Sequence, residues 1–171
     1  MFDQFSDRAR MVVFSARLMA GDRGATEIGN EHLLEGIIRE DAPTRRLPPY
    51  SVEIEAVQPH HAFFADSTAT ELLAELNPPS PNREAIQAVD MLRRQSTTLK
   101  PVPAADMPIS SGLGRTLTEA VALANDLRST NIEPLHLLAA MIQCDADICE
   151  RLDRHNVSLD AVLAAIRSSG Q

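Results

Sequence analysis

The chain has 171 residues, 44% of them apolar and 23% charged, which is enough to bury a core as one mid-sized domain or two small ones. Its 16 basic and 24 acidic side chains give a formal net charge of −8, and this acidic balance disfavours a nucleic-acid partner. The opening residues MFDQFSDRAR carry charges where a signal peptide needs an apolar run, and no stretch approaches the roughly 18 apolar residues of a membrane-spanning helix. These features predict a cytoplasmic protein that has no membrane partner.

The first two predicted elements are helices. An amphipathic helix begins after Ser6, whose hydroxyl can cap an exposed backbone N–H group. Its apolar residues recur with helical spacing at Ala9, Val12, Val13, Ala16 and Met19. A second helix is predicted over IGNEHLLEGII, residues 28–38, with Asn30 as its N-cap. Its leucines and isoleucines predict that it is central and strongly buried.

The stretch after this helix pair is less regular. RLPPYSVEIEAV, residues 46–57, predicts a third short helix, a turn and a fourth helix, and Pro59 should end or kink the fourth. Further on lie a short predicted helix in TATELLAEL after Ser67, the breaker NPPSP, a predicted helix near residues 82–94, and a proline-rich linker predicted to be disordered over residues 96–107. We interpret this material as a partly helical insertion that covers or extends the core.

The chain then repeats itself. IEPLHLLAAMI, residues 132–142, aligns without a gap with residues 28–38, and the same offset places Ser110 on Ser6. RLDRHNVSLDAV, residues 151–162, matches residues 46–57 at an offset one residue larger. The predicted fold is all-α, with two tandem pseudo-symmetric four-helix repeats: repeat 1 over residues 1–66 with an irregular fourth helix, an insertion and linker over 67–108, and repeat 2 over 109–171. Because one unit is too small to bury its apolar helix faces, we expect the repeats to pack as one domain.

These motifs resemble a known family. The tandem unit, with MFDQFSDRARMVV and IGNEHLLEGII in copy one, resembles the double Clp-N (Clp repeat) domain at the N-terminus of Clp ATPases. Copy one is similar to the ClpC type, whose pattern is F-[ST]-x-R-A-[RK] followed by I-G-T-E-H-[IL]-L-x-G-[IL]-I, and IEPLHLL in copy two looks more like the ClpB type. The resemblance covers about residues 1–57 and 109–168. The G-x-x-x-x-G-K-[ST] phosphate loop of the AAA+ modules does not occur in the sequence, so this chain cannot be the motor.

The resemblance implies a non-catalytic module of the Clp chaperone and protease system that recognises proteins or peptides, as an adaptor, a substrate-binding protein or a regulator. It also implies a phosphoarginine site in copy one, where Glu31 would pair with the guanidinium group while Asn30 and Ser6 lie near the phosphate. Copy two has Pro134 and Leu135 at the positions of Asn30 and Glu31, so it lacks the carboxylate. The structural alternative is that Glu31 is a first-turn acid favoured by the helix dipole and that Asn30 and Ser6 are only caps.

A second function implied by the resemblance is regulatory. Phe2 matches a phenylalanine that helps to form a groove between the two repeats of ClpC-type domains, and its partner position in the second repeat is Ile109. The alternative is therefore a regulator that binds a Clp ATPase or adaptor through this groove and has no substrate site.

Catalysis is the least favoured class. The sequence has no H-E-x-x-H, G-x-S-x-G or cysteine–histidine signature, although a minor alternative is a metal-dependent enzyme that gathers Glu31, His32, His60, His61, His136 and His155. His32 and His136 occupy the same repeat position, where we predict that each bonds a backbone group of the neighbouring loop. Cys144 and Cys149 are too few for a structural zinc site and are predicted to be idle thiols. We expect no catalytic residue, metal ligand or cofactor, and the acidic charge argues against a DNA-binding helix-turn-helix.

Overall fold

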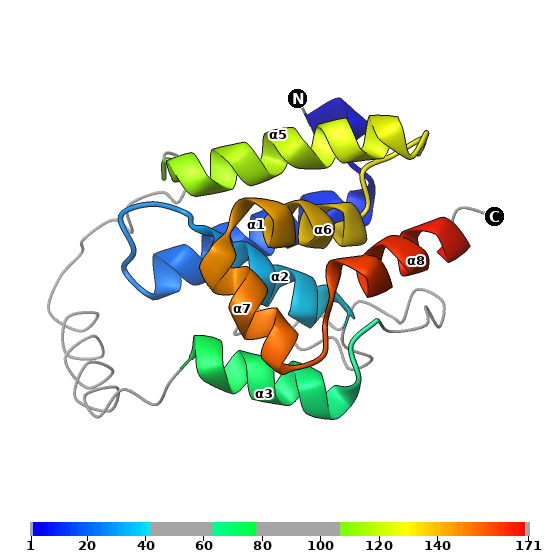
Figure 1. Cartoon of the computed structure of the whole chain (residues 1–171). Coiled ribbons are helices and arrows are strands. Elements are labelled where there is room, and N and C mark those ends of the chain that lie inside the picture. The colour runs from blue at the N-terminus through cyan, green and yellow to red at the C-terminus, as the bar shows by residue number, and fades with distance from the viewer. Residues whose placement is uncertain (1, 42–62, 78–106, 170–171) are drawn as a thin grey trace, which may run out of the picture.

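The computed structural model describes residues 2–41, 63–77 and 107–169, and this part of the chain consists of α-helices and one short 3-10 helix, η1 (Phe2–Gln4) (Figure 1). The predicted all-α fold is confirmed. The third and fourth helices predicted over residues 46–57, the helix predicted near 82–94 and nearly all of the predicted linker lie outside the described residues. Among the described helices, none is long and apolar enough to cross a membrane.

The first two helices, α1 (Asp7–Asp22) and α2 (Asn30–Asp41), form a hairpin. The Ser6 hydroxyl accepts the backbone N–H of Ala9 at 3.2 Å, which is the cap that the sequence predicts. The two helices touch at Gly36, where an added Cβ would lie 2.7 Å from the carbonyl oxygen of Val12. Glycine at this position therefore lets the backbone of α2 approach that of α1.

The second half of the chain starts with the same arrangement. Helices α5 (Ser111–Asp126) and α6 (Pro134–Cys144) form a second pair, and the Ser110 hydroxyl accepts the N–H of Leu113 at 3.1 Å. Pro134 takes the first position of α6, where its missing N–H group costs nothing. Two shorter helices, α7 (Ala146–Arg154) and α8 (Leu159–Ser169), complete the chain.

The two halves are joined crosswise by backbone hydrogen bonds. The N–H of Ser6 donates to the carbonyl of Ile132 at 3.1 Å, and the N–H of Ser110 donates to the carbonyl of Ile28 at 2.9 Å. The return bonds run from Ile132 to Gln4 and from Ile28 to Pro108, and each exchange forms an isolated parallel bridge. The segment before the first helix of each half therefore lies beside the residues that lead into the second helix of the other half.

The turn after the first helix also recurs, but with a different residue. The N–H of Ala25 donates to the carbonyl of Ala20, and the equivalent N–H of Ser129 donates to that of Ala124, both at 2.9 Å. Gly24 has a φ of 66° in the first turn, and Arg128 has a φ of 55° at the matching position of the second. Arg128 thus holds a left-handed conformation that glycine adopts more readily.

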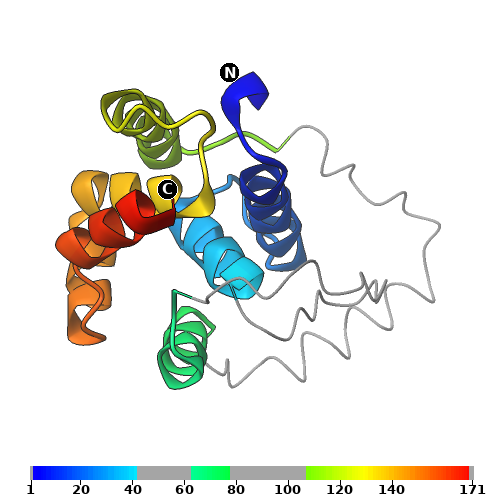
Figure 2. The ribbon, with the colours of Figure 1, turned by 90° about the vertical axis from the view of Figure 1, so that its right-hand side faces the viewer.

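The core lies between the second helices of the two halves. Leucine and isoleucine side chains of α2 and α6 are buried as predicted, among them Leu34, Ile37 and Leu138. Figures 1 and 2 show α2 and α6 in the middle of the molecule, with α1, α3, α5, α7 and α8 around them. One continuous apolar cluster contains residues of both halves.

Helix α3 (Asp66–Leu76) is the short helix predicted after Ser67, and it packs on the core. Leu72 is fully buried and belongs to the same cluster as the residues of α2. At its far end α3 meets α7, because Glu75 lies 2.9 Å from Nε2 of His155 and 3.3 Å from a guanidinium nitrogen of Arg154. This helix of the predicted insertion therefore bridges the two halves.

A buried carboxylate holds α3 to the first half. Glu35 of α2 accepts from the guanidinium of Arg39 at 2.7 Å and also pairs with Arg23. Arg23 in turn donates to the side-chain oxygen of Asn77, directly after α3. The matching position in α6 is Ala139, so this ion-pair network belongs to the half that carries α3.

Candidate functional site

The structure separates Ser6 from the other two residues of the predicted ligand site. Asn30 and Glu31 begin α2, whereas Ser6 precedes α1. Because the two helices form a hairpin, the start of α2 lies beside the end of α1, and the 16 residues of α1 span about 24 Å. Asn30 instead lies near Ser110, and Ser6 lies near Glu133.

Asn30 lies where the two halves meet. Its Nδ2 atom donates to Oδ2 of Asp145 at 2.8 Å, while the other oxygen of this carboxylate caps α7 by accepting the N–H of Ile148 at 3.2 Å. A Cβ added to Gly112 would lie 3.6 Å from Nδ2 of Asn30 and 3.8 Å from the Ser110 hydroxyl, so both polar groups flank this glycine. Asn30 is 5% exposed, and within the described residues its Oδ1 atom has no hydrogen-bond partner.

Glu31 presents a carboxylate next to this junction. Its side chain is 54% exposed, and an added Cβ on Gly29 would lie 2.5 Å from Oε2 of Glu31. The backbone N–H of Gly29 donates to Nδ1 of His32 at 3.0 Å, which leaves this nitrogen without a proton to offer Glu31. Within the described residues Glu31 has no arginine partner, so the carboxylate is free to pair with a guanidinium from outside.

The equivalent location in the other half already contains a carboxylate. The Ser6 hydroxyl donates to Oε2 of Glu133 at 2.9 Å, and Glu133 stands where the first half has Gly29. Leu135 occupies the position of Glu31. The side chain of Ser6 is therefore used within the protein, as a helix cap and as a donor to Glu133.

The prediction that the two repeated histidines have a structural role is confirmed. The N–H of Glu133 donates to Nδ1 of His136 at 3.0 Å, as the N–H of Gly29 does to His32, and Nε2 of His136 lies 2.9 Å from the Ser129 hydroxyl. Burial is the main cause that lowers the pKa of both His32 and His136, against smaller opposing effects of nearby carboxylates. Both imidazoles are therefore held neutral, with one ring nitrogen used by the backbone.

The described residues do not group their ligating side chains into a metal site. Within residues 2–41, 63–77 and 107–169, no three histidine, cysteine or acidic side chains are placed to hold a metal ion, and His60 and His61 lie outside these ranges. Burial raises the pKa of Cys144 and of Cys149, and Asp153 adds to the rise for Cys149. A raised pKa favours the unreactive thiol.

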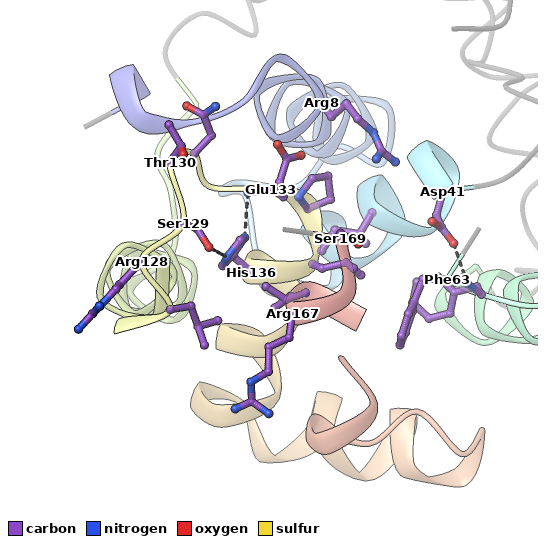
Figure 3. Close-up of a pocket in the computed structure, with 17 residues that line it drawn as sticks. Arg8, Asp41, Phe63, Arg128, Ser129, Thr130, Glu133, His136, Arg167 and Ser169 are labelled. Carbon is purple, nitrogen blue, oxygen red and sulfur yellow. Dashed lines mark hydrogen bonds between the residues drawn. The ribbon is translucent and has the colours of Figure 1, made fainter. Parts of the chain in front are cut away.

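A pocket of about 640 Å³ opens on the Ser6 side of the molecule (Figure 3). It lies between the start of α1, the end of α2, the residues before α3, the loop before α6 and the end of α8. Its charged lining consists of three arginines and two carboxylates, which are Arg8, Arg128, Arg167, Asp41 and Glu133. The two halves of the chain thus build this pocket together.

The predicted groove residues lie elsewhere. Phe2 is in η1, and Gln4 at the end of η1 helps to line a shallow hollow of about 430 Å³ against α5. Ile109 is 49% exposed, whereas Phe5, its counterpart in the first half, is 2% exposed. Ile109 is therefore one of the few large apolar side chains that the described part of the protein presents to solvent.

Sequence reasoning missed three polar residues of these locations, namely Ser110, Glu133 and Asp145. The repeat offset places Ser110 on Ser6, and this signal was in the sequence. It does not reveal that the halves exchange their leading segments, which is what brings Ser110 to Asn30 and Ser6 to Glu133. The sequence around Asp145 indicates at most a helix cap and does not indicate its contact with Asn30.

Two solved structures share this fold. The N-terminal domain of ClpD from Arabidopsis thaliana, a caseinolytic-protease-associated chaperone, is 18% identical with a TM-score of 0.61 over 98% of this chain and 97% of that one. A structure from preliminary investigations of a malarial protein secretion system is 17% identical with a TM-score of 0.55 over 97% of this chain and 94% of that one. No protein-family model and no curated protein matches the sequence. The chain therefore has a Clp-N-type fold.

Proposed function

We propose that this chain is a cytoplasmic, non-catalytic module that recognises proteins or peptides in the Clp chaperone and protease system. The Clp-N-type fold, shared with the N-terminal domain of the chaperone ClpD, supports this function. The observation that carries the proposal is Glu31, a half-exposed carboxylate at the junction of the two halves that has no arginine partner within the described residues. Such a group suits the guanidinium of an arginine side chain on a partner.

The proposed ligand is phosphoarginine in a peptide or protein. Glu31 would take the guanidinium, and the phosphate would lie toward Asn30 and the hydroxyl of Ser110, which replaces Ser6 in this role. Asp145 opposes the phosphate, because its carboxylate lies 2.8 Å from Nδ2 of Asn30. The balance between these charges sets the affinity for phosphoarginine relative to arginine.

The test is a calorimetric titration of the whole chain with free phosphoarginine, and with arginine for comparison. Glu31→Ala is expected to abolish measurable phosphoarginine binding, because the guanidinium loses its counter-charge. Asp145→Asn is expected to strengthen it, because the substitution removes a negative charge beside the phosphate and keeps an oxygen that can cap α7.

Ser6→Ala is the matched control for Ser110→Ala in this titration. Both substitutions remove a hydroxyl that caps the first helix of one half, but Ser6 lies at the start of α1, away from Glu31. We expect Ser110→Ala to weaken phosphoarginine binding and Ser6→Ala to leave it unchanged. Equal binding by wild type and Glu31→Ala, or no heat of binding with phosphoarginine at millimolar concentration, would contradict the phosphoarginine proposal.

A second candidate function is favoured by the exposure of Ile109. In it the chain is a regulator that binds a Clp ATPase or adaptor through a groove near Phe2 and Ile109. Ile109→Asp should then reduce retention of a purified Clp ATPase on the immobilised chain, whereas Glu31→Ala should not. If Ile109→Asp leaves this retention unchanged, the groove is not the docking surface.

A further inference from the structure

We propose that the pocket between α1, α2, α6 and α8 is a second peptide site, which binds an acidic segment through Arg128 and Arg167. This inference rests on the proposed function as a peptide-recognition module, but it uses a different location and the opposite ligand charge from the site at Glu31. Three independent features of the pocket support it.

The first feature is the balance of charge. Both carboxylates are engaged, since Asp41 accepts the N–H of Phe64 at 2.7 Å and Glu133 accepts the Ser6 hydroxyl at 2.9 Å. Arg8 lies 3.4 Å from Glu40. Arg128 and Arg167 are exposed, and the side chain of neither forms a hydrogen bond or ion pair with another described residue. The pocket therefore has two guanidinium groups that are unpaired within the described residues, although the net charge of the chain is −8.

The second feature is the backbone of Arg128. Its φ of 55° occurs at the position where the first half of the chain has Gly24, so an arginine is held in a conformation that favours glycine. Strained residues of this kind concentrate at functional sites, where the strain can be part of how the site works. The position places the arginine at the rim of the pocket.

The third feature is an apolar wall on the side of the pocket away from Arg128. The rings of Phe63 and Phe64 pack edge to face with centroids 5.2 Å apart, and Phe63 is only half-buried. Ile166 lines the same pocket. Figure 3 shows Arg128 and Phe63 on opposite sides of His136, with the guanidinium groups of Arg128 and Arg167 extended away from His136. An extended peptide crossing the rim can therefore place an acidic side chain on the arginines and an aromatic side chain beside Phe63.

The probe for this site is the peptide acetyl-Gly-Phe-Glu-Glu-Gly-amide, titrated into the ¹⁵N-labelled full chain and followed by amide chemical shifts. The matched control peptide carries Gln-Gln in place of Glu-Glu. We expect the acidic peptide to shift the amides of Ser129, His136 and Ile166, with an affinity that falls as salt is raised. The glutamine peptide should bind several times more weakly.

Arg128→Gly and Arg167→Ala should each weaken the acidic peptide about threefold, as expected for an exposed charge pair, and the double variant should weaken it about tenfold. Arg115→Ala, an exposed arginine of α5 outside the pocket, serves as the control and should change nothing. Arg128→Gly keeps the fold, because glycine suits this conformation.

Equal binding of the two peptides, or unchanged binding by the double variant, would overturn this proposal. Shifts confined to Gly29, Glu31 and Ser110 would overturn it as well, because the peptide would then occupy the other site. Glu31→Ala separates the two ideas: it should abolish phosphoarginine binding and leave the acidic peptide unaffected.

Discussion

Arg128 is the residue whose local conformation conflicts most clearly with its type. A residue other than glycine pays about 1 kcal/mol to hold a left-handed φ, and the side chain of Arg128 forms no hydrogen bond with the described residues that would offset this cost. Arg128→Gly should therefore raise the free energy of unfolding by about 1 kcal/mol, measured by urea denaturation at pH 7.5. Gly24→Arg at the matching turn should lower it by a similar amount. A destabilising effect of Arg128→Gly would mean that the arginine side chain stabilises the fold through contacts that outweigh the strain.

Sequence reasoning at this scale succeeded where a residue acts on its own chain neighbours. The caps by Ser6 and Ser110 and the backbone bonds of His32 and His136 each span three residues, so helical geometry alone predicts them. The site at Glu31 depends on residues from the other half. A single sequence shows that two segments are equivalent but does not show which of them touch.

Helix α3 shows how far a sequence pattern can define an element without defining its role. TATELLAEL predicts a helix, and the structure places it at Asp66–Leu76. The pattern does not reveal that the C-terminal end of this helix is anchored to both halves, by Asn77 to Arg23 and by Glu75 to the arginines of α7 and to His155 directly after it. Those contacts join residues far apart in the chain, so no local signal carries them.

The contribution of α3 can be measured by comparing its apolar and its charged contacts. Leu72 is fully buried, so Leu72→Ala should lower the free energy of unfolding by about 2 to 5 kcal/mol. Glu75 pairs with partly exposed side chains, so Glu75→Gln should cost under about 1 kcal/mol. Denaturation of both variants in urea, with hydrogen exchange of the α3 amides, checks this order. A loss under about 1 kcal/mol for Leu72→Ala would show that the packing of α3 on the core contributes little to the stability of the fold.

At the scale of the whole molecule, the crosswise bonds between Ser6 and Ile132 and between Ser110 and Ile28 make the two halves interdependent. Neither half supplies all the partners of its own leading segment, and the apolar cluster continues from α2 to α6. Unfolding should therefore be cooperative over the described residues. The same interdependence explains why both candidate sites draw residues from both halves.

Because unfolding is cooperative, the free energy of unfolding of the whole fold depends on the titration of its two buried histidines. His32 and His136 have lowered pKa values when folded, whereas in the unfolded chain they titrate near their ordinary pKa of 6.5. Below pH 6.5 the unfolded chain therefore binds more protons than the folded one, and the free energy of unfolding must fall as the pH decreases toward the folded pKa values. Above pH 6.5 this stabilising contribution is fully present.

Urea denaturation at pH 7.5 and 5.5 tests the effect, and His136→Gln is the informative variant. Glutamine at this helix position can still accept the N–H of Glu133 but does not titrate. We expect His136→Gln to be less stable than the wild type at pH 7.5, because it loses the packing of the imidazole, and to lose less stability between pH 7.5 and 5.5. An identical loss for both proteins would show that His136 does not contribute to the pH dependence. His32 or acidic side chains would then be its source, although Glu75, whose pKa is lowered chiefly by its hydrogen bond to His155, should lose its contribution only below pH 4.5.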